Sequence, residues 1–267
     1  MAELRTTSAD GTPLTALDDG RGPTLLLVHG GGESPASWDA VLPALTGHFR
    51  VVRIARRLYA PGANAPATHS MAVEAADVLA IARLLTGPLV LVGHSSGAVA
   101  ALETALRSPG VAAGLVLYEP PLPTRALVGG EAARRARAAL AAGEPEQALR
   151  IHLRDIAQEP AERVERLLAA VRRPMSPRPG LAAGLADIAA LDALGTGVER
   201  FRRLDVPTTL VEGDRSPARL RDRLADLAAA LPDARVVTLA GHGHTAHRTA
   251  PRALAAAIRE AAGRALC

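Results

Sequence analysis

The sequence predicts an α/β domain in which a mostly parallel sheet is covered by helices on both faces. Short apolar runs alternate with longer helix-like segments, and these runs are almost continuously apolar. Strands that are apolar on both faces are typical of parallel sheets, because helices cover both sides. The chain has 267 residues, of which 48% are hydrophobic and 22% charged. This composition excludes a disordered chain, and the length allows a sizeable core.

The expected strands are runs rich in Val, Leu and Ile, mostly bounded by Gly or Pro. They are residues 24–28, 51–54, 89–92, 115–118, 208–211 and 235–239. The segments between them predict helices at about 36–45, 71–85, 96–107, 217–230 and 251–265. Because strands and helices alternate along the chain, the strands are expected to be joined by helical crossovers.

The segment 123–203 interrupts this alternation. It has no clear strand, and its composition of Ala, Leu, Arg and Glu predicts several short helices. A helical insertion over the ends of strands is usually a cap or lid, although a purely structural excursion is the alternative. We therefore expect a core formed by residues 1–122 and 204–267, with a helical cap at 123–203.

Composition also excludes several classes of partner. All 31 basic residues are Arg, they are scattered among 27 acidic residues, and the net charge is only +4, so no nucleic-acid partner is expected. The apolar runs are too short to span a membrane, and the polar N-terminus does not resemble a signal peptide, which favours a cytoplasmic protein. The single cysteine, Cys267, excludes an internal disulfide and a multi-cysteine zinc site.

A nucleophile motif follows the expected strand 89–92. Residues 93–97 read Gly-His-Ser-Ser-Gly and lead directly into a helix. In this strand–turn–helix context, G-x-S-x-G is typical of a nucleophile elbow that exposes a serine above the sheet. Ser95 is therefore the candidate nucleophile, and His94 is interpreted as packing. The alternative is an ordinary serine that caps a helix, a role that Ser96 could also fill.

Upstream, the strand 24–28 ends in His-Gly-Gly-Gly at residues 29–32. Acyl transfer needs two backbone N–H groups directed at the developing oxyanion, one of them from the residue after the nucleophile. Ser96 and Gly31 are the candidates. Taken alone, the glycines would indicate only a flexible turn.

A histidine cluster follows the last strand, where residues 241–247 read Gly-His-Gly-His-Thr-Ala-His. An imidazole is needed to accept the serine proton and return it to the leaving group. His244 is the candidate base, with His242 in reserve. The spacing also suggests a metal site, but no Cys, Asp or Glu lies nearby in the sequence, so we expect neither a metal nor a cofactor.

These motifs, in this order along nearly the whole chain, resemble those of the α/β-hydrolase fold family. The resemblance implies an eight-stranded, mostly parallel sheet, a cap inserted after the sixth strand, and cofactor-free hydrolysis through an acyl-enzyme. It also implies an acid between the serine and the histidine in chain order.

The position of this acid departs from the common family pattern. After the seventh strand the chain reads Gly-Asp-Arg-Ser at residues 213–216, so Ser216 stands where a carboxylate is expected and Asp214 is offset by two positions. In some relatives, which resemble haloalkane dehalogenases, the acid follows the sixth strand, where this chain has Glu119. Glu119 is favoured, with Asp214 and a triad lacking an acid as alternatives. Glu119 could instead be a structural carboxylate at the cap hinge that bonds backbone amides.

A second departure follows the strand 51–54, where Arg56 and Arg57 are expected to form structural ion pairs rather than to contact an acidic substrate. The function predicted from all these residues is a carboxylesterase-like serine hydrolase (EC 3.1) acting on an ester, thioester or related acyl bond of a small apolar molecule. The alternatives are a biosynthetic lyase or cyclase that reuses the triad, and a non-catalytic receptor on the same scaffold.

Overall fold

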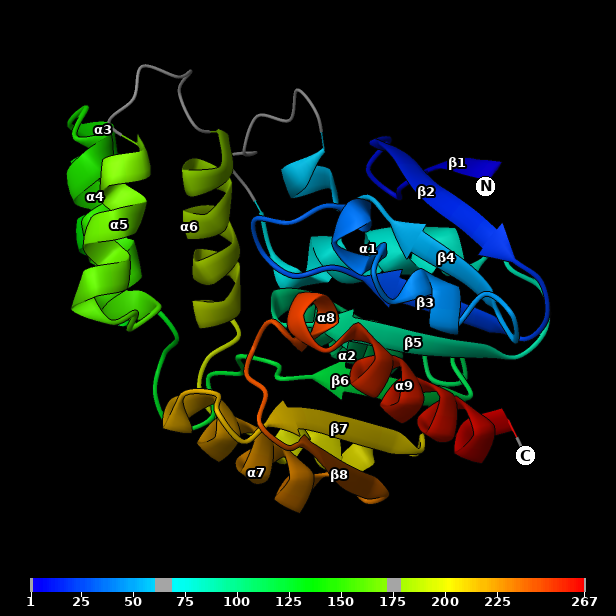
Figure 1. The fold of residues 1–267 in the computed structure, drawn as a ribbon. Helices are drawn as coiled ribbons and strands as arrows, with labels where there is room; N and C mark the ends of the chain where they lie inside the picture. The colour runs from blue at the N-terminus through cyan, green and yellow to red at the C-terminus, as the bar shows by residue number, and fades with distance from the viewer. Residues whose placement is uncertain (1, 61–68, 172–178, 267) are drawn as a thin grey trace.

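The computed structural model describes residues 2–60, 69–171 and 179–266, and in them the chain forms one eight-stranded sheet with helices on both sides (Figure 1). The strand order is β1-β2-β4-β3-β5-β6-β7-β8. The strands are β1 (Ala2–Thr7), β2 (Pro13–Gly20), β3 (Thr24–Val28), β4 (Arg50–Ile54), β5 (Leu89–His94), β6 (Gly114–Tyr118), β7 (Thr208–Gly213) and β8 (Ala234–Leu239). Cys267 lies outside the described residues.

Strands β3 to β8 are parallel to one another, as the alternation of strands and helices predicts. The central strands β3, β5 and β6 are buried along their whole length, which explains why their sequences are apolar on both faces. Strands β1 and β2 pair antiparallel at one edge, and sequence patterning did not identify them. Both are partly exposed, so neither contains a continuous apolar run.

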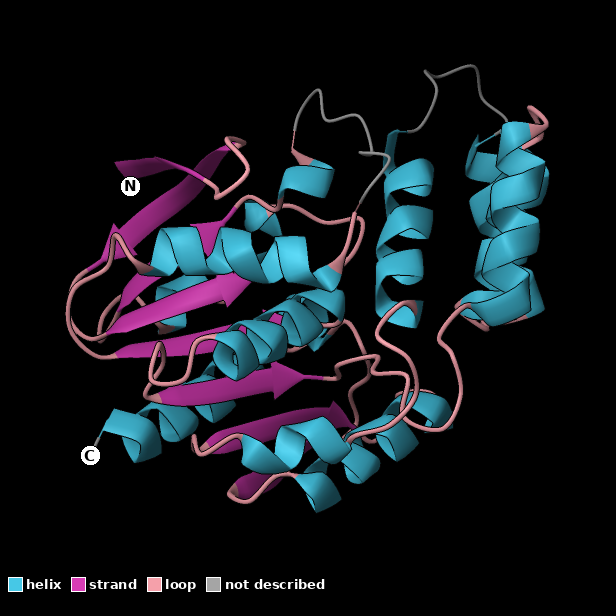
Figure 2. Cartoon of the chain, turned by 180° about the vertical axis from the view of Figure 1, so that it is seen from behind, coloured by secondary structure: helices cyan, strands magenta, loops and turns pink. Residues whose placement is uncertain are grey.

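Two apolar layers enclose the sheet, one on each face. On one face, α1 (Met71–Ala82), α2 (Ser96–Arg107) and α7 (Ala218–Ala230) pack against residues such as Leu26 and Leu91 (Figure 2). On the other, α9 (Pro251–Leu266) and the short α8 (Ala246–Thr249) pack with Trp38 against Leu25 and Val90. In the described part of the chain, no helix is both long and apolar enough to cross a membrane.

The helix expected at about 36–45 is not formed. Two short 3₁₀ turns occur there instead, η1 (Pro35–Trp38) and η2 (Leu42–Ala44). Pro43 lies in the first turn of η2, and a proline within a longer helix would remove a backbone hydrogen bond and clash with the preceding turn. The apolar residues of this segment are nevertheless buried, Trp38 and Val41 among them, so the apolar pattern reflects packing rather than one continuous helix.

Helices fill the connection between β6 and β7. They are α3 (Gly130–Ala141), α4 (Pro145–Ile151) continued by the π-helical η4 (His152–Ile156), α5 (Ala161–Val171), α6 (Pro179–Asp192) and the 3₁₀ helix η5 (Glu199–Arg203). Helices α3 to α6 stand beside the carboxyl ends of the central strands, with α6 nearest the sheet (Figures 1 and 2). Residues 172–178 of the expected cap lie outside the described residues. The helices α3, α4 and α6 share a small apolar core of their own.

Candidate active site

The nucleophile elbow is a strained turn between β5 and α2. Ser95 has φ 53° and ψ −130°, a backbone conformation that residues other than glycine rarely adopt. The two glycines of the motif are required by close packing. A Cβ atom at Gly93 would lie 2.3 Å from the Ala98 Cα, and one at Gly97 would lie 2.3 Å from the carbonyl oxygen of His29. The turn therefore has the geometry that G-x-S-x-G predicts, with Ser95 at its apex.

Glu119 and His244 lie in direct contact. A Glu119 carboxylate oxygen, Oε2, is 2.6 Å from the His244 Nδ1 atom, and Oε1 accepts a hydrogen bond of 2.7 Å from the Gly213 amide. Glu119 is fully buried at the end of β6, with a positive φ of 46° that turns the chain out of the strand. Burial raises the pKa of this carboxyl, but the hydrogen bond and charge of His244, together with the Ser216 hydroxyl and the hydrogen bond of the Gly213 amide, outweigh burial and hold the pKa below its ordinary value.

The two reserve residues lie elsewhere. Asp214 is exposed, and its Oδ1 atom accepts a hydrogen bond of 2.8 Å from the Gly241 amide, so it closes the turn beside β8. The His242 carbonyl accepts a hydrogen bond from the Arg215 amide, and the residue is not part of the cavity described below. Ser216, at the position of the usual family acid, is buried and uncharged. Of the two acids considered for the triad, Glu119 contacts His244 and Asp214 bonds the Gly241 amide instead.

Ser95 and His244 line one cavity of about 960 Å³ at the carboxyl ends of the strands. Helices of the insertion and α7 form its other walls, with Leu149, Ile156 and Ile188 among the apolar side chains. Among the residues that the structure describes, no hydrogen bond to the Ser95 hydroxyl is formed. Catalytic hydrogen bonds are often long in the absence of substrate, so this geometry is compatible with a nucleophile and base that come together on binding.

The two candidate oxyanion residues, Gly31 and Ser96, line the same cavity. Ser96 is the first residue of α2, where the backbone N–H groups have no partner within the helix. Gly31 follows β3, the strand next to β5. A Cβ atom at Gly31 would lie 3.1 Å from the Tyr59 hydroxyl and 3.2 Å from an Asp187 oxygen, so the space around this residue is nearly filled.

The Ser96 side chain is held by a buried network of charged residues. The Ser96 hydroxyl donates to Asp187 Oδ2 at 2.6 Å and accepts from the Arg56 guanidinium at 2.8 Å. Arg56 also donates to Asp187 Oδ1 and to Glu74, both at 2.9 Å, and the Tyr59 hydroxyl donates to Asp187 at 2.7 Å. Burial raises the pKa of Asp187, but the Arg56 charge and the polar contacts from His69, Ser96 and Arg56 together outweigh burial, and the carboxyl is ionised.

This network has two consequences for the expectations above. Arg56 and Arg57 form structural ion pairs, Arg57 with Asp10 and Asp77. Asp187, by contrast, was not identified from sequence. It lies in α6, 91 positions after Ser96, inside an Ala-rich segment with no motif, so nothing in the sequence pointed to this contact.

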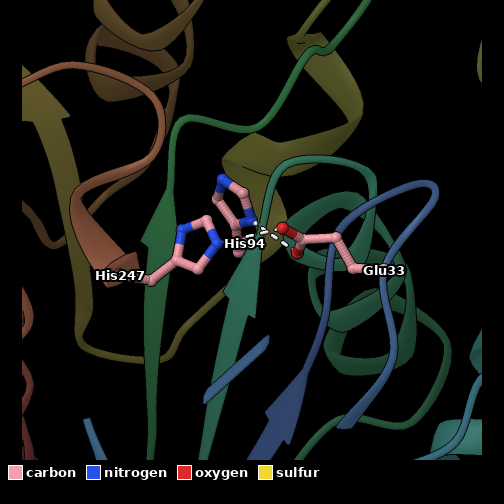
Figure 3. A group of neighbouring side chains, drawn as sticks. All are labelled: Glu33, His94 and His247. Carbon is pink, nitrogen blue, oxygen red and sulfur yellow. Dashed lines mark hydrogen bonds and ion pairs between the residues drawn. The ribbon is translucent and has the colours of Figure 1, made fainter. Parts of the chain in front are cut away.

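Glu33 links the loops that carry the candidate residues (Figure 3). Its carboxylate lies 2.9 Å from His247 Nε2 and 3.3 Å from His94 Nδ1, while His94 Nε2 donates to the His244 carbonyl at 2.9 Å. Burial, partly offset by Glu33, lowers the pKa of His94 to about 4. His94 is thus a buried packing residue that also holds the backbone of His244.

The same three side chains are a set that could hold a metal ion in the described part of the chain. The ligand atoms of Glu33, His94 and His247 all lie within 4.8 Å of one another (Figure 3). Sequence reasoning found no acid near the histidines because Glu33 precedes His247 by 214 positions. In the present arrangement the Glu33 carboxylate contacts His94 Nδ1 and His247 Nε2, which connects the loop after β3 to the end of β5 and to α8.

Comparison with known proteins places this geometry in a family. A family model described as the alpha/beta hydrolase family matches residues 25–257, which is most of the chain and includes every candidate residue. The chain belongs to the alpha/beta hydrolase family. The eight-stranded, mostly parallel sheet that the resemblance implied is therefore confirmed as that of an alpha/beta hydrolase fold.

Among its relatives in this family, a pimeloyl-[acyl-carrier protein] methyl ester esterase of Methylococcus capsulatus is 37% identical over 99 residues, which is 37% of each chain. The match between this chain and that curated relative thus spans little more than a third of the relative's length. Solved structures are similar over almost the whole fold. An alpha/beta hydrolase from Sphaerobacter thermophilus has a TM-score of 0.78 and 28% identity, covering 96% of this chain and 99% of the other.

A hydrolase from Pseudomonas aeruginosa has a TM-score of 0.75 and 25% identity, and the similarity covers 98% of both chains. A thermophilic esterase from Thermogutta terrifontis, at 21% identity and a TM-score of 0.77, shares the fold over the full length of both chains. The family member described here therefore has esterases and other hydrolases as homologues and structural neighbours.

Proposed function

We propose that this family member is a serine hydrolase that cleaves an ester, thioester or related acyl bond of a small molecule. The observation that carries the proposal is the contact between Glu119 and His244 on the wall of the cavity that also contains Ser95. An acid–histidine pair beside a serine on a strained elbow is the arrangement that acyl transfer requires. A curated relative, a pimeloyl-[acyl-carrier protein] methyl ester esterase, supports the same class.

The proposed mechanism assigns one role to each residue. Because His244 Nδ1 faces Glu119, its Nε2 is the nitrogen available to take the Ser95 proton. The Ser95 oxygen bonds to the acyl carbon, the carbon–oxygen bond to the alcohol breaks, and the alcohol leaves with the proton from His244. Water, deprotonated by His244, then releases the acid and restores Ser95. The Gly31 and Ser96 amides would stabilise the oxyanion in both steps.

We further propose that the helices between residues 123 and 203 act as a cap that controls access to the cavity. This rests on their place beside the strand ends and on their contribution to the cavity wall. Asp187 would anchor this cap, because it connects α6 to Arg56 and Ser96 in the core.

The experiment that tests the proposed function is labelling with a fluorophosphonate probe, followed by a panel of 4-nitrophenyl esters of increasing acyl length. A competent serine hydrolase is labelled at Ser95, and Ser95→Ala abolishes both labelling and turnover. A receptor on the same scaffold would bind small molecules without being labelled. A labelled protein that hydrolyses none of the esters or thioesters would favour a lyase or cyclase.

A further inference from the structure

Four arginines line the same cavity as Ser95, whereas only two of the acidic residues that the structure describes line it. The side chains of the cavity lining therefore carry a net positive charge. The arginines are Arg163 on α5, Arg215 after β7, and Arg219 and Arg223 on α7, whereas the acids of the lining are Glu159 and Asp187. Glu159 is paired with Arg163 at 3.2 Å, and Asp187 is paired with Arg56 behind the cavity. In the described part of the chain, the remaining three arginines have no ion-pair partner.

Arg219 has a buried donor atom that lacks a hydrogen-bond acceptor within the ranges that the structure describes. Its Nη2 atom donates to the Ala157 carbonyl at 2.6 Å, but its Nη1 atom is buried and has no hydrogen-bond partner among the described residues. Arg223 donates only to the backbone carbonyls of Leu122 and Leu127. A buried donor without an acceptor costs free energy, more so when it is charged. Both side chains line the cavity, so an oxygen anion bound there would provide an acceptor for the Arg219 Nη1 atom.

The spacing of the two arginines adds to this argument. Arg219 and Arg223 are four residues apart on α7, so they project from one face of the helix, and like charges at this spacing repel. Burial lowers the pKa of Arg219, and the neighbouring Arg223 charge lowers it further. The charges of Glu159 and, to a smaller extent, Glu119 partly offset this lowering of the Arg219 pKa.

We infer that the Arg219 and Arg223 side chains form an anion subsite, and that the substrate of this hydrolase carries a carboxylate that binds there while its acyl bond lies at Ser95. The inference rests on the proposed function and replaces the expectation of a wholly apolar substrate. Apolar residues such as Leu149 and Ile156 line other parts of the cavity and suit an alkyl spacer between the two ends. Arginine is suited to this role, because its planar fork binds a carboxylate through two hydrogen bonds.

The test compares esters of equal chain length with and without the carboxylate. The mono(4-nitrophenyl) esters of glutaric, adipic and suberic acids are matched with 4-nitrophenyl alkanoates of the same carbon number. A third series, acyl esters of 3-hydroxy-4-nitrobenzoic acid, carries the carboxylate in the alcohol half. For the wild type, we expect kcat/KM for one charged series to exceed that of its neutral match by about tenfold or more.

Arg219→Gln is expected to lower this charged-to-neutral ratio by about 10- to 100-fold, which is the range for losing a hydrogen bond between charged groups. Arg219→Lys should retain part of the preference. Arg221→Gln is the matched control, because Arg221 lies on the same helix, is exposed and does not line the cavity, and it should leave the ratio unchanged. Both esters are measured on one preparation, so a partly folded variant does not change the ratio.

A wild-type ratio of one or less in both charged series, or an Arg219→Gln ratio equal to that of the wild type, would overturn the anion subsite. Failure of the proposed function looks different: neither ester is cleaved and the phosphonate probe does not label Ser95. In that case, binding of adipate itself is measured by calorimetry. Binding that is weakened by Arg219→Gln but not by Arg221→Gln still supports the subsite, and equal or absent binding in all three proteins refutes it.

Discussion

Replacing Glu119 by glutamine removes one negative charge and changes little else in the structure. In the proposed mechanism His244 becomes positively charged when it takes the serine proton, and the Glu119 carboxylate, 2.6 Å from His244 Nδ1, would stabilise that charge. Two unit charges whose centres are about 4 Å apart interact by about 4 kcal/mol at an effective dielectric constant near 20. The loss of this interaction in the transition state corresponds to a decrease of about 10³-fold in kcat.

The hydrogen bond from the Gly213 amide can persist in this variant, because a glutamine oxygen also accepts it. We therefore expect the Glu119→Gln protein to fold, with a thermal unfolding temperature close to that of the wild type. The amide would face the His244 Nδ1 atom with either an oxygen or an NH₂ group, and the second choice would impose the wrong tautomer for catalysis. The decrease in turnover is therefore not expected to be smaller than the charge alone predicts.

The assay is the rate of 4-nitrophenyl ester hydrolysis at saturating substrate, with phosphonate labelling as a second readout. Asp214→Asn is the matched control, because it removes the same charge from an acid two positions from the usual family site, exposed and bonded only to the Gly241 amide. We expect it to lower turnover less than fivefold. If Glu119→Gln keeps turnover within fivefold of the wild type, or if Asp214→Asn is the more damaging change, the assignment of Glu119 as the acid is wrong.

Three further predictions concern the elbow, the cap anchor and pH. Ser95→Ala should lower turnover by about 10⁴- to 10⁶-fold, and a rate near that of the wild type in a stopped assay would exclude the acyl-enzyme. Asp187→Asn leaves Arg56 with one fewer buried counter-charge, so urea unfolding should show a loss of about 3 kcal/mol, and an unchanged midpoint would contradict the anchoring role. Burial, with the Arg56 charge, lowers the pKa of His29 to about 4. The unfolded chain therefore binds this proton at higher pH than the folded one, and the unfolding free energy should fall by about 2 kcal/mol for this group from pH 7 to pH 5. His29→Gln should flatten this dependence in urea unfolding at the two pH values, and equal slopes would show that His29 is not the cause.

Sequence patterning identified the parts of the fold where one local rule acts. Strands such as β3 and β5 are apolar along their length, and α2 was predicted with the bounds that the structure shows. Sequence patterning failed where contacts between distant parts of the chain determine the secondary structure. Strand β2 has one buried and one partly exposed face, and it is held in the sheet by pairing with β4, whose partner residues lie 30 to 38 positions later in the sequence. The segment 36–45 has helix-like apolar spacing, but Pro43 is incompatible with the interior of one continuous helix.

The candidate site shows the same division. Ser95, Gly31 and His244 stand in short motifs whose spacing follows from the chemistry, so the sequence was sufficient to propose them, and the structure places all three on the lining of one cavity. Glu119 could be chosen because it directly follows an expected strand next to that of the nucleophile. The Asp187 contact depends on how an inserted helix docks on the sheet, and no local pattern encodes that docking.

The position of Asp187 also limits how this chain can be recombined with its relatives. The helices between β6 and β7 form an insertion that protein engineering could exchange for that of a relative. Here a carboxylate of this insertion is one of two buried counter-charges of Arg56, a fully buried residue of the core, and accepts a hydrogen bond from the Ser96 hydroxyl. A foreign insertion without an acid at this point would leave a buried guanidinium short of one partner and the Ser96 hydroxyl without its acceptor. A chimera that keeps the core of this protein therefore needs an insertion that provides a carboxylate at the place of Asp187.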